Sequence, residues 1–265
     1  HLGARRSGGG YATRAGRVNR FRPTRGTSVD RRALNRYWLD QYLSGWQGSK
    51  ERAPRRGWIM LKIWGRTDSY NLQKVMWCVA ELGIEHIRID AGGTFGVTDG
   101  SEYLAMNPNG RVPTIDDDGF VLWESNAIVR YLAARHGTGT LCPADSQRRA
   151  DADRWMTWQS ATVGRNMRGL IHTMFNPPPE QRNSVTAAPM IETATGHWAI
   201  LDDQLRGCDF VLGREFTMAD IPMGAYALRW FKMDIDRPAM PHLEAWYVRL
   251  QDREAYRTYV MAPFE

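Results

Sequence analysis

Apolar and polar residues follow two different periods along the chain from residue 60 onward. Residues 60–64 are dominated by apolar side chains, as in a buried strand, whereas residues 71–82 repeat apolar side chains at the three- and four-residue spacing of a helix. Gly83 then stands where a helix would end, and residues 116–119 have the composition of a hairpin turn. The pattern predicts strands at residues 60–65, 84–89, 112–116 and 120–123, and helices at residues 71–82, 101–105 and 124–136.

The second part of the chain has only the helical period. Residues 147–175 form one long helical stretch that the prolines after Asn176 should end, and further helices are predicted at 189–206 and from about 241 and 253. Thr217 precedes another helix, with Asp220 three residues later in the position of a capping box. Residues 137–143 read as a linker. We therefore expect an α/β domain at residues 60–137, with its first two strands parallel, followed by an all-α domain at residues 147–265.

The first 59 residues differ from the rest in composition and charge. They contain 14 Lys/Arg and three acidic residues, whereas residues 60–265 contain 21 basic and 26 acidic residues. They show no sustained period, so they cannot bury enough apolar surface to offset the entropy of ordering them. We expect residues 1–59 to be a disordered basic extension outside the native fold, and Met60 to be the natural start. An Arg-rich targeting peptide or nucleic-acid arm is the alternative interpretation.

The bulk composition argues against several classes of partner. Because the basic excess lies in residues 1–59 and the remainder is mildly acidic, we expect no nucleic-acid partner. No apolar run approaches the roughly 20 residues of a membrane span, so we expect no membrane partner. The three cysteines and six histidines are scattered, which predicts a reduced, cytoplasmic protein without a metal site.

Two neighbouring stretches carry most of the chemistry. Residues 107–115 read NPNGRVPTI, a turn followed by a buried strand that opens with proline, and residues 123–132 read WESNAIVRYL, a strand end followed by a helix start. The free N–H groups and positive dipole end of that helix favour a carboxylate, to which Ser125 adds a hydroxyl, while Glu124 favours an ammonium group. A small zwitterion, such as an amino acid or the γ-glutamyl end of glutathione, would satisfy both.

These stretches resemble the cytosolic glutathione transferase superfamily. The resemblance extends to residues 69–77, SYNLQKVMW, and to residues 216–221, FTMADI, and it covers nearly all of the chain from Met60 to about Phe264. It is closest to bacterial members of the theta, beta and Nu types. It implies a thioredoxin-like N-terminal domain that binds glutathione at residues 60–137, an all-helical domain at 147–265 that forms the electrophile site, and usually a homodimer.

The resemblance also implies roles for individual residues. Pro113 matches a cis-proline that bends the strand, so that the backbone of Val112 pairs with the cysteinyl unit of glutathione. Glu124 and Ser125 match the residues that hold the γ-glutamyl ammonium and carboxylate. Arg111 is either the cation for a peptide carboxylate or a solvated loop arginine. Glutathione enters as a co-substrate, and no metal is required.

The chemistry requires a thiolate, and two residues match groups that stabilise it. A thiol with a pKa near 8.5 is mostly protonated at neutral pH, so a hydroxyl or amide N–H at the start of the helix at 71–82 must favour the charged sulfur. Ser69 matches the catalytic serine of theta- and zeta-class relatives, and Asn71 matches the asparagine that contacts the glutathione sulfur in Nu-class relatives. Each has a structural alternative, since both residue types also cap helices.

The second substrate is expected to be a small hydrophobic electrophile. Trp155, Trp158 and His172 are the candidates for its site, although tryptophan at helical spacing packs more often in the core. We therefore predict a transferase that conjugates the glutathione thiolate to such an electrophile, as detoxification enzymes do. Two alternatives remain: a glutathione-dependent disulfide reductase or peroxidase in which Asn71 dominates, and a non-enzymatic transferase-like binding scaffold.

Overall fold

Strands from the first part of the chain form one mixed sheet in the computed structural model, which describes residues 60–264. They are β1 (Leu61–Trp64), β2 (His86–Ile89), β3 (Thr114–Asp117) and β4 (Phe120–Trp123), in the order β2-β1-β3-β4. β1 and β2 are parallel, as expected for strands joined by a helix, and the other pairs are antiparallel. β3 begins two residues later than predicted, because Pro113 has no N–H to contribute to the ladder.

The predictions for residues 1–59, including the basic extension, lie outside the described residues. None of the helices within residues 60–264 combines the length and apolar character that crossing a bilayer requires. Within the same residues, no group of three or more His, Cys, Asp or Glu side chains is arranged so that it could hold a metal ion.

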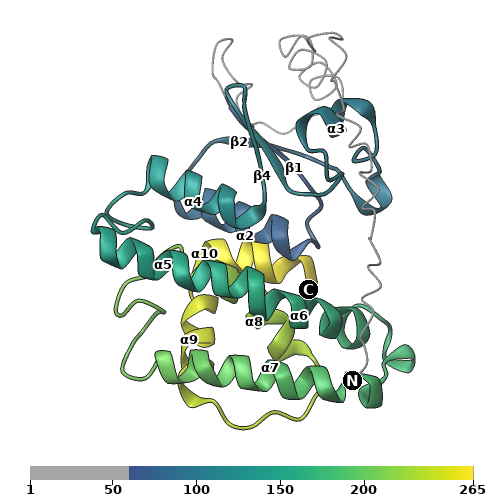
Figure 1. Cartoon of the computed structure of the whole chain (residues 1–265), viewed down its shortest axis with the longest axis vertical. Helices are drawn as coiled ribbons and strands as arrows, with labels where there is room; N and C mark the ends of the chain where they lie inside the picture. The colour runs from purple at the N-terminus through teal and green to yellow at the C-terminus, as the bar shows by residue number, and fades with distance from the viewer. Residues whose placement is uncertain (1–59, 265) are drawn as a thin grey trace, which may run out of the picture. The chain divides into compact units, whose positions relative to one another are not determined.

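Three helices flank the sheet: α2 (Tyr70–Glu81), α3 (Ser101–Met106) and α4 (Ser125–His136). α2 and α4 pack against each other on the side of the sheet that faces the helical part of the chain, and α3 lies on the other side (Figure 1). Because α2 is enclosed between the sheet and that helical part, its residues 72–79 are all buried, including the polar Gln73 and Lys74. Two long polar side chains are thereby withdrawn from water beside the start of α2.

The remainder of the described chain is helical, which confirms the predicted fold class of an α/β domain followed by an all-α domain. Its helices are α5 (Ser146–Trp158), α6 (Gly164–Leu170), α7 (Ser184–Gln204), α8 (Asp220–Lys232), α9 (Pro241–Gln251) and α10 (Glu254–Tyr256). The helical stretch predicted at 147–175 is α5 and α6, each followed by a π-helical turn, Gln159–Val163 and Ile171–Phe175. The helix predicted to begin at 189 begins at Ser184, because the Asn183 side chain caps it by accepting from Thr186 N–H at 2.9 Å.

Asp220 anchors the start of α8 inside the helical domain. Its fully buried carboxylate accepts hydrogen bonds from the backbone N–H groups of Val211 (2.9 Å) and Thr217 (3.0 Å) and from Trp246 Nε1 (3.0 Å). The bond to Thr217 is the predicted capping-box contact, although α8 begins three residues after Thr217. Burial raises the pKa of Asp220 to about 6, against the opposing effect of these hydrogen bonds.

Aromatic packing and an ion pair join α2 to the helical domain. The ring of Trp77 packs against those of Tyr256 and Phe216, with centroid distances of 4.7 and 5.3 Å. Glu81, at the end of α2, pairs with Arg253 at 2.5 Å. These contacts lie on the face of α2 that points away from the sheet and attach it to the helical domain. The first turn of α2 therefore has a defined position relative to both domains.

Candidate functional site

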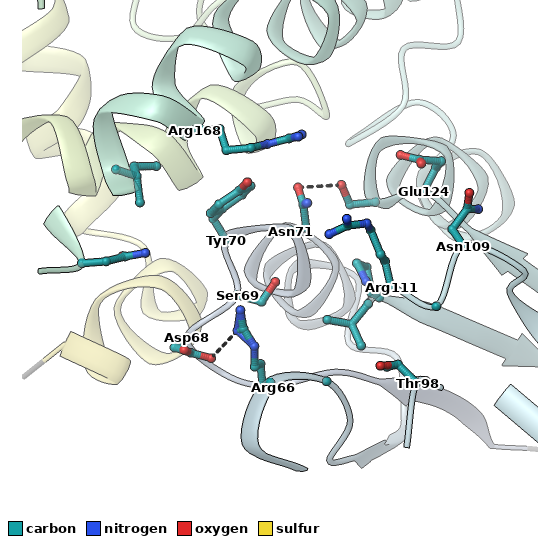
Figure 2. A pocket seen from close by; sticks show the side chains of 18 of the residues that line it. Arg66, Asp68, Ser69, Tyr70, Asn71, Thr98, Asn109, Arg111, Glu124 and Arg168 are labelled. Carbon is teal, nitrogen blue, oxygen red and sulfur yellow. Dashed lines mark hydrogen bonds and ion pairs between the residues drawn. The ribbon is translucent and has the colours of Figure 1, made fainter. Parts of the chain in front are cut away.

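One cleft brings together the residues predicted to act on glutathione (Figure 2). It has a volume of about 1030 Å³ and is lined by the start of α2, the loop before β3, the start of α4, and α6 with the turn after it. Among its lining residues are Ser69, Asn71, Arg111, Val112, Pro113, Glu124, Ser125 and His172. The cleft therefore assembles groups that are far apart in the sequence.

Trp155 and Trp158, the tryptophans predicted for the electrophile site, do not line this cleft. Trp155 is 7% exposed, and its ring meets that of Trp158 edge-on at 5.3 Å. Trp158 in turn meets the ring of His197 at 6.0 Å. These tryptophans pack in the helical domain, because the face of α5 that carries them points into the domain. His172 is exposed at the cleft, where it lies 3.5 Å from Asn176 Nδ2.

Glu124 and Ser125 lie at the start of α4, on one side of the cleft. Glu124 is the residue before the first turn and adopts a positive φ of 73°, which is rare for a residue with a side chain. No side chain caps α4, so the N–H groups of its first turn remain available at the cleft. The hydroxyl of the buried Ser125 donates to Asn71 Oδ1 at 3.2 Å. A carboxylate beside an uncapped helix start suits the ammonium and carboxylate of one amino-acid moiety.

The backbone of Val112 is available to pair with an extended ligand. The Val112–Pro113 peptide bond is cis, as the family resemblance implied. Neither the N–H nor the C=O of Val112 forms a hydrogen bond with another residue of the described chain. The carbonyl of Arg111 is held by the Tyr103 hydroxyl and by Asn107 Nδ2, both at 2.7 Å. Because the loop is anchored in this way, Val112 presents a fixed donor and acceptor to the cleft.

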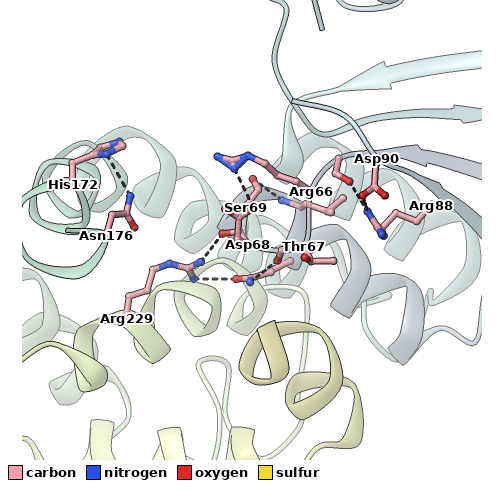
Figure 3. Close-up of polar contacts among 12 residues, drawn as sticks. Arg66, Thr67, Asp68, Ser69, Arg88, Asp90, His172, Asn176 and Arg229 are labelled. Carbon is pink, nitrogen blue, oxygen red and sulfur yellow. Dashed lines mark hydrogen bonds and ion pairs between the residues drawn. The ribbon is translucent and has the colours of Figure 1, made fainter. Parts of the chain in front are cut away.

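Ser69 caps α2 and can still donate a hydrogen bond into the cleft. Its Oγ accepts from the Leu72 N–H at 3.4 Å, which leaves the hydroxyl hydrogen for another partner. The neighbouring Asp68 carboxylate is 62% exposed and pairs with Arg66 at 3.2 Å (Figure 3). The negative charge that would oppose a thiolate is therefore solvated and paired.

A buried lysine sets the orientation of the Asn71 amide. Lys74 Nζ donates to Asn71 Oδ1 (3.1 Å), to Gln159 Oε1 (3.1 Å) and to Asn126 Oδ1 (3.4 Å). Because an ammonium group only donates, each partner must present its oxygen to Lys74. The amide nitrogen of Asn71 is then left to donate elsewhere, and Asn71 lines the cleft.

The environment of Lys74 also changes its acidity. Burial lowers the pKa of Lys74 to about 7, the carboxylate of Glu124 opposes that shift, and the charges of Arg229 and Arg168 add to it. Sequence reasoning missed this lysine, because a helical lysine is ordinarily solvated. Its burial follows from the packing of a sheet and a second domain around α2, which the sequence does not show.

Arg229, from α8, ties the helical domain to the loop before α2 (Figure 3). Its side chain is almost completely buried, and it donates to Gln73 Oε1 (3.0 Å) and to the carbonyl of Asp68 (3.1 Å). Its guanidinium lies 4.7 Å from the ring centroid of Phe264. Burial lowers the pKa of Arg229 to about 10. The tether holds the residue before Ser69, and sequence reasoning missed it because the contact spans both domains.

Residues 60–134 match the family model described as glutathione S-transferase, N-terminal domain. Known proteins are also similar to this chain over most of its described length. Glutathione S-transferase GstB of Escherichia coli K12 is 37% identical over 206 residues, which cover 77% of this chain and 99% of that protein. The theta-class glutathione S-transferase of Xanthomonas axonopodis pv. citri, in the structure with glutathione bound, is 42% identical with a TM-score of 0.73, covering 77% of this chain and 98% of that one. Disulfide-bond oxidoreductase YfcG of Escherichia coli K12 is 29% identical over 185 residues, which cover 66% of this chain and 82% of that protein.

Proposed function

Because the chain belongs to the glutathione S-transferase family, we propose that it binds glutathione in this cleft, ionises its thiol and transfers the thiolate to a small electrophile. The observation that carries the proposal is the convergence of three features in one cleft: the start of α2, the unpaired backbone of Val112 and the uncapped start of α4. Together they offer complementary groups to every part of a γ-glutamyl-cysteinyl peptide.

Each unit of glutathione has a partner in this arrangement. Glu124 binds the γ-glutamyl ammonium, and the first-turn N–H groups of α4, including that of Ser125, bind the adjacent carboxylate. The N–H and C=O of Val112 pair with the cysteinyl unit in the manner of an added strand. Arg111, which is exposed at the cleft, binds the terminal carboxylate.

Ser69 and Asn71 activate the sulfur in this proposal. The Ser69 hydroxyl retains its hydrogen, and the Asn71 amide nitrogen is free because its oxygen accepts from Lys74 and Ser125. A hydrogen bond to a charged group contributes about 1.5–3 kcal/mol, which lowers the pKa of a thiol by about one to two units. From about 8.5, one such bond brings the thiol pKa to about 6.5–7.5, so a substantial fraction of the bound thiol is ionised at neutral pH.

The two donors can be separated by Ser69→Ala and Asn71→Ala, with Ser101→Ala as a matched control because Ser101 is exposed and lies outside the cleft. The thiolate of bound glutathione is titrated by its ultraviolet absorbance, and kcat/KM is measured with an aryl halide. We expect Ser69→Ala to lower kcat/KM about 100-fold, Asn71→Ala about tenfold, and Ser101→Ala to have no effect. Unchanged thiol pKa in both cleft variants would contradict the assignment.

Glutathione-dependent disulfide reduction is the second candidate. It is favoured by the orientation of the Asn71 amide and by the similarity to an oxidoreductase of disulfide bonds. Assaying the same variants with a mixed disulfide distinguishes the two activities. Losses confined to Asn71→Ala and to disulfide substrates would favour the reductase over the transferase.

Other expectations from the sequence remain proposals. We propose a homodimer in the cytoplasm with a role in detoxification, and two domains at residues 60–137 and 147–265. Light scattering after size-exclusion chromatography tests the dimer directly. A monomeric mass would contradict it without bearing on the chemistry of the cleft.

A further inference from the structure

The charges that line the cleft are not balanced within the described part of the chain. Four arginines and two carboxylates line it: Arg66, Arg111, Arg168, Arg229, Asp68 and Glu124. Asp68 is already paired with Arg66. Glutathione brings two carboxylates and one ammonium, which the proposed site matches with Arg111, the start of α4 and Glu124. This assignment leaves Arg168 as the exposed arginine of the cleft that has no charged group of glutathione or of the described residues to pair with.

Arg168 extends from α6 on the helical side of the cleft, across from Arg111 (Figure 2). Its side chain is exposed and forms no hydrogen bond or ion pair with any residue in the range 60–264. Its charge nevertheless acts inside the site. After the larger effects of burial, which lowers the pKa of Lys74, and of Glu124, which raises it, the charges of Arg229 and Arg168 both lower it.

An apolar wall adjoins this arginine. Residues 168, 171, 172 and 175 have the spacing of one helical face and all line the cleft. Ile171 and Phe175 contribute apolar surface, and the ring of Phe264, which also lines the cleft, lies 5.3 Å from that of Phe175. The helical side of the cleft is therefore a cation beside a partly aromatic wall. That combination binds an apolar body carrying a negative group better than it binds a neutral one.

We propose that the electrophile of this site carries a carboxylate on a small apolar body, and that Arg168 binds that carboxylate. The inference rests on the transferase function proposed above, and it narrows the small hydrophobic electrophile expected from the sequence to one that carries a carboxylate. With an aryl halide, the glutathione sulfur bonds to the ring carbon that bears the halogen. The carbon–halogen bond then breaks, halide leaves with its electron pair, and the thiol proton passes to solvent. Arg168 orients the ring and takes no part in the bond changes.

A pair of substrates with the same leaving group tests this preference: 4-chloro-3-nitrobenzoate and its neutral amide. Each kcat/KM is divided by the uncatalysed rate constant with glutathione thiolate, which removes the difference in ring reactivity. We expect a preference of about tenfold for the benzoate, equivalent to about 1.4 kcal/mol. Arg168→Gln should abolish the preference for the benzoate over the amide. Arg165→Gln, which removes an exposed arginine of α6 outside the cleft, should keep the preference.

The two glutathione conjugates provide a measurement that does not depend on turnover. Calorimetry with S-(4-carboxy-2-nitrophenyl)glutathione and its amide should show about tenfold tighter binding of the acid, lost in Arg168→Gln. Equal affinities would overturn the proposal. An equal loss for both conjugates in Arg168→Gln would also overturn it, because Arg168 would then bind glutathione itself. Selective binding of the acid without turnover of either halide would reject the transferase function and leave the anion preference standing.

Discussion

Replacing Lys74 by methionine tests how the start of α2 activates a thiol. Lys74 is 2% exposed. Methionine keeps most of its side-chain volume and removes the ammonium group, which is hydrogen-bonded to Asn71 at 3.1 Å. Without that donor the Asn71 oxygen keeps only the hydrogen bond from Ser125, so the amide can turn its oxygen toward the sulfur more easily. The positive charge near the thiolate is lost at the same time. Both changes disfavour S⁻, so the bound thiol should become less acidic.

The size of the effect follows from the geometry. With one amide between them, Nζ and the sulfur are on the order of 7 Å apart, and unit charges at that distance attract by about 2 kcal/mol at an effective dielectric constant of about 20. Because the pKa of Lys74 is about 7, only about half of that charge is present at neutral pH. We therefore expect Lys74→Met to raise the pKa of the bound thiol by about one unit.

The assay is a pH titration of the glutathione thiolate by ultraviolet absorbance at saturating enzyme, for the wild type, Lys74→Met, Asn71→Ala and the double variant. Lys232→Met, which removes an exposed lysine of α8, is the control for loss of a positive charge. If Lys74 acts through Asn71, its replacement should raise the pKa much less in the Asn71→Ala background. Thermal unfolding confirms that each variant is folded.

Two outcomes would refute this reasoning. The first is an unchanged thiol pKa in a folded Lys74→Met protein, which would make the lysine purely structural. The second is full additivity of Lys74→Met and Asn71→Ala, which would mean that the lysine does not act through the amide. A shift of similar size in Lys232→Met would point to net charge alone as the cause.

The remaining predictions concern binding and stability. Glu124→Gln should weaken binding of glutathione about tenfold in calorimetry but leave unchanged the affinity for an analogue that lacks the γ-glutamyl amino group; an equal loss for both ligands would contradict the assigned contact. Arg229→Met should leave the Asp68 carbonyl without a donor, lowering kcat about tenfold and stability by about 2–4 kcal/mol in urea unfolding; unchanged kcat in the folded variant would exclude a positioning role. Asp220→Asn should cost about 3 kcal/mol in the same experiment, because one amide oxygen cannot accept all the hydrogen bonds that the carboxylate accepts. The folded pKa of Lys74, about 7, lies below its unfolded value of 10.5, so the cost of burying its charge is complete below about pH 7 and is relieved as pH rises to 10.5. Across that interval the free energy of unfolding of the wild type should rise relative to that of Lys74→Met, by at most about 5 kcal/mol. Parallel plots of unfolding free energy against pH for the two proteins would refute this.

The fold class and the glutathione side of the cleft could be predicted because their determinants are local. Glycine, proline and capping residues mark the ends of α2, β3 and α4 in short stretches of sequence. The start of α4 attracts anions because its N–H groups are unsatisfied, whatever the rest of the chain does. The cis peptide before Pro113 also belongs to a local motif.

The residues on the helical side of the cleft could not be identified from the sequence alone, for a reason that lies in helical geometry. A helical period shows that one face turns inward, but not whether that face meets a packed core or an open cleft. The face carrying Trp155 meets the core, and the π-helical turn Gln159–Val163 adds a residue that rotates the faces of α6 relative to those of α5. The cleft is consequently lined by Arg168, Ile171 and Phe175, which the period alone did not distinguish.

By itself the sequence determined the order of the helices and strands, the division into an α/β and an all-α domain, and the polar groups at the starts of α2 and α4. It could do so because propensity, periodicity and capping act over a few residues. Only the tertiary structure decided the states of Lys74 and Arg229, whose partners Gln159 and Gln73 lie 85 and 156 positions away. Their burial follows from the packing of two domains around α2. Desolvation, which lowers both pKa values, depends on what surrounds a charge in space and not on its neighbours in the chain.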